Sequence, residues 1–230
     1  MEDEIQAYFL AVEEYFVWRI GGPLILSPED VEAVTGWWRE GIPIEAVQRG
    51  IDGHLLRLEA NPRRKRRARA VRYCDADVRD AWDDLQAAKL GDRRGEGLEE
   101  PARVGRVLER AGAGLREAAA RAEGRGAGDL AERMAGGAEE VARMGLSFAG
   151  GALGAEALEE ALRALDATLL EALRASAAGE LEGLREESAR RLADVRERME
   201  PKAFERTRDV LAEKLLRERH ALPRLSLYSY

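Results

Sequence analysis

The fold class follows from residues 26–59, which read LSPEDVEAVTGWWREGIPIEAVQRGIDGHLLRLE. Ser27 is a favourable N-cap residue, and Pro28 then occupies the first position of a helix. Gly41 is placed to end that helix, and Pro43 is placed to begin the next one. Apolar residues recur at intervals of three and four on both sides of the turn, which is the spacing of one helical face. The segment therefore predicts two amphipathic helices joined by a short turn.

The same periodicity extends the helical pattern in both directions. An earlier helix should end before Gly21-Gly22-Pro23, and a later one should carry Val78, Trp82 and Leu85 on one face. All four tryptophans lie before residue 83, which concentrates the large apolar side chains in this part of the chain. We therefore expect residues 1–90 to form a small N-terminal helical module with its own core.

Charge is distributed unevenly along this module. Residues 1–60 contain 12 acidic and 4 basic residues, whereas residues 61–73 contain seven basic residues and no acidic one. The basic residues of this segment are Arg63, Arg64, Lys65, Arg66, Arg67, Arg69 and Arg72. A run of this kind can contact several phosphates, so segment 63–72 predicts a nucleic-acid-binding arm. The alternative is an internal counter-charge for the acidic segments on either side, and the sequence leaves both interpretations open.

The rest of the chain divides by composition into three further segments. Residues 91–154 hold 15 of the 23 glycines, and each glycine inside a helix costs about 1 kcal/mol relative to alanine. We therefore expect a flexible Gly/Ala/Arg-rich region with short helices there. Residues 155–220 show leucine stripes that predict long amphipathic helices of about 20 residues, with a last helix from Pro201. These helices should form a helical hairpin, bundle or coiled coil, so the predicted fold class is all-α.

The segment 221–230 is expected to be an extended apolar tail. Its side chains would be exposed unless a partner receives them, which makes Leu225, Leu227, Tyr228 and Tyr230 candidate partner-binding residues. The leucine stripes of residues 155–217 are a second candidate surface, either for a protein partner or for self-association.

Several function classes are disfavoured by the composition. Cys74 is the only cysteine, so an internal disulfide or a thiolate zinc site is not expected, and we predict a buried core residue. Neither His54 nor His220 is placed by the local sequence as a base for catalysis. Asp77, Asp80 and Asp84 share a helix face without a histidine nearby, which favours a solvated face over a metal site. We expect no catalytic residues, no metal and no cofactor.

The compartment is expected to be the cytoplasm. The sequence has no run of 18 apolar residues, and its first residues, MEDEIQAYF, are acidic where a signal peptide is basic. A membrane span is therefore not expected.

A family resemblance lies in the same region that decides the fold. The motifs that carry the resemblance are Leu26-Ser27-Pro28-Glu29-Asp30, Trp38 and Gly41-Ile42-Pro43, with Tyr73-Cys74 further on. Through these motifs the N-terminal region resembles a family of uncharacterised bacterial helical proteins. The resemblance covers roughly the first 90 residues and implies no assigned activity. The helix order and the Trp-bearing second helix are also similar, more loosely, to the DnaD-type helical modules of replication initiation.

Residues 30–58 also have the outline of a helix-turn-helix. A recognition helix presents basic or amide side chains to DNA from its first turns. The second helix here instead has Pro43, Glu45 and Asp52, so an ordinary helical hairpin is favoured. Two functions remain. The first is a non-enzymatic DNA-associated accessory protein that binds nucleic-acid backbone through the Arg-rich segment. The alternative is a structural or assembly adaptor that uses the C-terminal helices and apolar tail.

Overall fold

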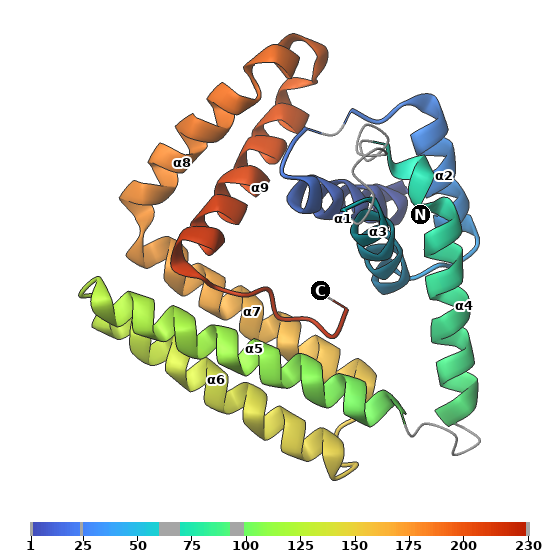
Figure 1. The fold of residues 1–230 in the computed structure, drawn as a ribbon. Coiled ribbons are helices and arrows are strands. Elements are labelled where there is room, and N and C mark those ends of the chain that lie inside the picture. The colour runs from blue at the N-terminus through green and yellow to red at the C-terminus, as the bar shows by residue number, and fades with distance from the viewer. Residues whose placement is uncertain (1, 24, 60–69, 93–98, 229–230) are drawn as a thin grey trace. The chain divides into compact units, whose positions relative to one another are not determined.

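The computed structural model describes residues 2–23, 25–59, 70–92 and 99–228 (Figure 1). Within these residues every regular element is an α-helix or a 3₁₀ helix, which confirms the all-α class. The elements are α1 (Glu2–Ile20), α2 (Pro28–Arg39), α3 (Ile44–Glu59), η2 (Val71–Cys74), α4 (Asp75–Asp92), α5 (Glu99–Gly124), α6 (Gly128–Ala149), α7 (Ala155–Ser176), α8 (Ala178–Arg191), η3 (Ala193–Arg198) and α9 (Pro201–His220). None of the helices in these described stretches is both long and apolar enough to cross a membrane.

The described residues form two compact units. Unit 1 combines the first 95 residues with residues 185–214, and unit 2 combines residues 96–184 with residues 215–229. The unit boundaries fall inside α8 and α9, so each of these helices contributes residues to both units.

Helix α2 begins and ends where the sequence predicts. The Ser27 hydroxyl accepts a hydrogen bond from the Asp30 backbone N–H (3.2 Å), and the Ser27 N–H donates to the Asp30 carboxylate (3.0 Å), which is a complete capping box. Gly41 follows the helix with a φ of +70°, in the left-handed region that glycine tolerates best. The Ile42 N–H then reaches back to the Trp37 carbonyl (2.9 Å), which closes the helix end and redirects the chain into α3.

Unit 1 has a core built from the apolar faces of its helices. The fully buried side chains include Phe16 of α1, Trp37 of α2 and Ile51 of α3, and Phe204 and Leu211 of α9 join the same cluster. Helices α3 and α4 approach unusually closely, because a Cβ placed on Gly50 would lie 2.4 Å from the Cα of Val78. Only glycine fits at this crossing.

Unit 2 corrects the expectation for residues 91–154. Instead of short helices, α5 extends over 26 residues and α6 over 22, and the two pack against each other, with α7 against α6. Their buried residues recur at helical spacing, as in Leu130, Met134 and Val141. At least one glycine of these helices is a contact site, because a Cβ on Gly137 would lie 2.9 Å from Leu169.

The C-terminal half follows the prediction in part. Helix α7 has 22 residues and α9 begins at Pro201, as expected, but α8 has only 14 residues and is followed by the 3₁₀ helix η3. The leucine stripe of α7 is buried within the chain itself, including Leu158, Leu162 and Leu173. The stripe therefore closes a core inside unit 2.

We predict that Gly50→Ala lowers the free energy of unfolding by about 2–3 kcal/mol, because the added methyl group forces α3 and α4 apart. The measurement is urea denaturation followed by tryptophan fluorescence, since all four tryptophans lie in unit 1. Gly53→Ala in the same helix is the matched control, because its Cβ would meet only the end of the Arg57 side chain at 3.8 Å. This control should gain up to about 1 kcal/mol from helix propensity. Equal stability of the two variants would show that the close crossing is not a constraint.

Candidate functional site

The predicted nucleic-acid-binding segment lies between the end of α3 and the start of η2. Arg63, Arg64, Lys65, Arg66, Arg67 and Arg69 lie outside the described residues, whereas Arg72 is described. Both borders of the segment are anchored in the core of unit 1. Leu58 in the last turn of α3 is buried, and Val71 at the start of η2 has no exposed surface.

Arg72 makes an internal ion pair, and its side chain stays 36 % exposed. Its guanidinium lies 3.0 Å from the Ser27 hydroxyl and 3.3 Å from the Asp30 carboxylate, and it stacks over the Tyr73 ring. The backbone N–H of Arg72 also donates to Asp30 (2.9 Å). Arg72 therefore has a structural role, and its contact with nucleic acid stays a prediction. Its main role in the structure is to fasten η2 to the first turn of α2.

Asp30 is the centre of this contact. Burial raises the pKa of its carboxyl, but the hydrogen bonds from the Arg72 and Ser27 backbones and the adjacent guanidinium outweigh burial and hold the pKa below its usual range. A carboxylate that is 1 % exposed therefore stays ionised, because four groups on two segments donate to it or neutralise it.

The acidic face predicted on residues 75–84 is only partly solvated. Asp77 is buried, and its carboxylate bonds the Nδ1 of His54 (2.8 Å) and pairs with Arg57, so it ties α4 to α3. Its expected solvated position is therefore wrong. Asp84, in contrast, is 66 % exposed and pairs with Arg49 at 3.2 Å.

Two further carboxylates of unit 1 hold partners across the core. Asp52 is fully buried, accepts a hydrogen bond from the Tyr15 hydroxyl (2.7 Å) and pairs with Arg19, which joins α3 to α1. Asp75 accepts a hydrogen bond from the indole N–H of Trp37 (2.7 Å). Asp52 thus points into the core and cannot face DNA, which agrees with an ordinary helical hairpin. No local sequence signal identified Asp52 as a core residue.

Cys74 and His54 have the environments of structural residues. Cys74 is buried, as predicted, and burial raises the pKa of its thiol to about 12, so the thiolate is scarce at neutral pH. Burial, assisted by the neighbouring Arg57, lowers the pKa of His54, which favours the neutral imidazole.

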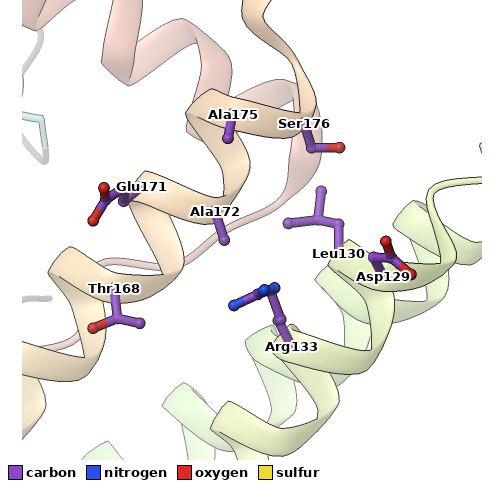
Figure 2. Close-up of a pocket in the computed structure, with 8 residues that line it drawn as sticks. All are labelled: Asp129, Leu130, Arg133, Thr168, Glu171, Ala172, Ala175 and Ser176. Carbon is purple, nitrogen blue, oxygen red and sulfur yellow. The ribbon is translucent and has the colours of Figure 1, made fainter.

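Unit 2 has an open cleft of about 460 Å³ between α6 and α7 (Figure 2). It is lined by Asp129, Leu130, Arg133, Thr168, Glu171, Ala172, Ala175 and Ser176. In Figure 2 the guanidinium of Arg133 lies between the two helices, while the carboxylates of Asp129 and Glu171 point away from each other. The Thr168 hydroxyl is bonded to the Ala164 carbonyl (2.9 Å). The lining holds no histidine or cysteine, and among the described residues no three His, Cys, Asp or Glu side chains are grouped to hold a metal ion.

The candidate partner-binding residues of the tail have a different environment from the one predicted. Leu225 and Leu227 are each 1 % exposed, and Tyr228 is half-buried. Tyr230 lies outside the described residues. The two leucines are therefore received by unit 2 of their own chain, and a partner could reach them only after the tail had detached.

The buried state of Asp30 predicts a pH dependence of stability. A carboxyl with a depressed pKa in the folded chain stabilises it above the unfolded pKa of about 3.9, and this contribution disappears as pH falls through the lower folded value. Asp30→Asn should therefore cost about 1–2 kcal/mol at pH 7, and the difference from the unsubstituted protein should shrink below pH 4. Urea titrations at several pH values test this, with Glu32→Gln on the exposed side of α2 as the control. A difference that is constant from pH 7 to pH 3 would contradict it.

Comparison with known proteins gives a partial family assignment. No curated protein and no solved structure matches the chain, so the looser similarity to DnaD-type modules is not supported. Residues 7–94, which include most of α1 and all of α2, α3, η2 and α4, match the model of a family described as Uncharacterised protein, and this confirms the resemblance expected for the N-terminal 90 residues.

Proposed function

We propose that this protein is a non-enzymatic, DNA-associated accessory protein that binds nucleic-acid backbone through the basic segment Arg63–Arg69 of unit 1. The observation that supports the proposal is the state of the acidic groups of unit 1. The interpretation of the segment as an internal counter-charge requires carboxylates that need a cation, and the buried ones on α2, α3 and α4, namely Asp30, Asp52 and Asp77, already have partners.

The partners of these carboxylates come from outside the basic segment. Asp30 is bound by Ser27 and Arg72, and Asp52 by Tyr15 and Arg19. The remaining described pairs are Asp75 with Trp37 and Arg79, Asp77 with His54 and Arg57, Glu40 with Arg79, and Asp84 with Arg49. A carboxylate that is already paired attracts a second cation only weakly, because the first cation neutralises most of its field. We therefore propose that the six cations of residues 63–69 bind an external polyanion.

The anchoring of both borders supports the same proposal. Because Leu58 and Val71 are buried in the core of unit 1, the two borders of the segment lie at defined places on a folded module. Contacts of lysine and arginine with phosphate carry no sequence information, so the expected mode is binding of the backbone without base reading.

The adaptor alternative loses part of its support. It depended on apolar side chains that await a partner, and Leu225, Leu227 and most leucines of the α7 stripe are buried within the chain. We therefore favour the nucleic-acid proposal.

We predict that the intact protein binds labelled single- or double-stranded DNA with an affinity that falls steeply with salt. If all six cations of residues 63–69 contact phosphates, the slope of log K against log salt should reach about −5. Changing Arg63, Arg64, Arg66 and Arg67 to Glu should weaken binding about a hundredfold or more at low salt. Fluorescence anisotropy between low and physiological salt measures both effects.

The matched control changes four exposed arginines of unit 2, Arg106, Arg110, Arg116 and Arg133, to Glu. Both variants change the net charge by the same amount, so a loss confined to the first variant assigns binding to the segment and not to overall charge. Circular dichroism and thermal melting establish that each variant is folded. Absence of binding by the folded intact protein at low salt would overturn the proposal.

A further inference from the structure

The segment that follows α9 is bound to unit 2 in the manner of a peptide. We call residues Ala221–Tyr228 the strap. They have no regular secondary structure and run alongside α5 and α7 (Figure 1). We call the side chains and helix positions that hold them the seat, namely Arg103 and Gly114 of α5, Glu159 and Asp166 of α7, and Arg217 of α9.

Side chains of the seat make four hydrogen bonds with the main chain of the strap. The N–H of Leu225 donates to Asp166 (2.9 Å), and the N–H of Leu227 donates to Glu159 (2.7 Å). Two arginines donate to strap carbonyls, Arg217 to that of Pro223 (3.1 Å) and Arg103 to that of Leu227 (3.2 Å). Donors and acceptors of the strap are thus both satisfied by side chains of unit 2.

Apolar side chains of the strap also contribute to its binding, because they are buried against unit 2. Leu222, Leu225 and Leu227 are buried, and the last two are separated by one residue. Pro223 packs on Gly114, where a Cβ would lie 3.0 Å from the proline ring. Main-chain hydrogen bonds combined with pockets for alternate side chains are the features by which proteins bind extended peptides.

The seat is unfavourable when it is empty. Glu159 is buried and accepts hydrogen bonds from the Leu227 N–H and from the Ser226 hydroxyl (2.8 Å), so loss of the strap removes two of its donors. Asp166 would keep its pair with buried Arg217 (2.7 Å) but lose the Leu225 N–H. Glu159 would likewise keep its ion pair with Arg163 (2.8 Å), so an empty seat loses hydrogen bonds but keeps both ion pairs. Hydrogen bonds lost from buried carboxylates cost free energy, which favours a seat that holds a strap.

The connection between α9 and the strap is strained. Ala221 has a φ of +55° and is the only non-glycine residue with a positive φ in the part of the chain that the structure describes. A side chain in this left-handed region costs about 1–2 kcal/mol. Short connections under strain favour the exchange of the segment that they hold, because an open connection releases the strain.

We propose that the seat is an interaction surface for a second copy of this chain, and that two copies exchange their straps. Residues 221–228 of one copy occupy the seat of the other, where they make the same hydrogen bonds and bury the same leucines. The exchange retains the hydrogen bonds between the strap and the side chains of the seat and relaxes Ala221, but it opens the end of α9, where the N–H groups of Ala221 and Leu222 donate to the carbonyls of Glu218 (3.3 Å) and Arg217 (2.9 Å). The loss of these two hydrogen bonds and the entropy of association oppose the exchange, which therefore depends on protein concentration.

Variants at Ala221 test the proposal in the full chain. Ala221→Gly removes the strain from the closed monomer and should lower the association constant of the dimer about fivefold per connection. Ala221→Val tolerates a positive φ less well and should raise this association constant. Size-exclusion chromatography with light scattering over a wide concentration range measures these constants. A chain that stays monomeric at every concentration, or a dimer that is unchanged in both variants, would overturn the proposal.

A mixing experiment tests the seat and the strap separately. Leu225→Asp impairs the strap but leaves the seat intact, and Gly114→Leu obstructs the seat at Pro223 but leaves the strap intact. Mixed, the two variants can form one complete seat–strap pair, so native mass spectrometry should show the mixed dimer several-fold above either homodimer. A mixture that equals the sum of its separate components would overturn the proposal. Neither variant touches residues 63–69, so DNA binding and strap exchange can fail independently.

Discussion

The carboxylate of Asp30 joins two segments that are 42 residues apart, and the arrangement of unit 1 depends on it. The same group completes the N-terminal cap of α2, receives the backbone of Arg72 and neutralises its guanidinium. Helix α2 therefore begins at the point where η2 is fastened. The two borders of the basic segment become fixed positions on one folded module and not the ends of a free linker.

Unit 2 uses buried carboxylates in a similar way, with a different chain segment as the donor. Glu159 and Asp166 on α7 receive the backbone of the strap, as Asp30 receives the backbone of Arg72. The difference lies in what fixes the bound segment on both sides. The Arg72 backbone lies within η2, between buried Val71 and buried Cys74, whereas the strap is joined to α9 through a strained residue, Ala221. The same kind of contact therefore gives a permanent junction in one unit and an exchangeable one in the other.

Local sequence chemistry explains which parts of the fold could be predicted. The cap at Ser27, the turn at Gly41 and the start of α9 at Pro201 depend on neighbouring residues, so the pattern located them within a residue or two. The glycine-rich region failed as a prediction because propensity counts every glycine as a cost. At Gly137 the glycine lets α6 approach Leu169, and packing of this kind overrides propensity. The burial of Leu225 could not be predicted from the local sequence either, because its N–H donates to the carboxylate of Asp166, which lies 59 residues earlier in the chain.

The candidate site shows the same limit for charge. Block sums of charge predict where cations and anions are numerous, but pairing depends on three-dimensional neighbours such as His54 and Asp77, which belong to different helices. Several acids that the block sums count as neighbours of residues 63–69, such as Asp30 and Asp52, are buried and paired with other residues of unit 1. Buried pairs such as Asp52 with Arg19 are screened little by salt, whereas contacts between exposed arginines and phosphates are screened strongly. Raising the ionic strength should therefore weaken the binding of a polyanion while leaving the buried ion pairs, and with them the fold, intact.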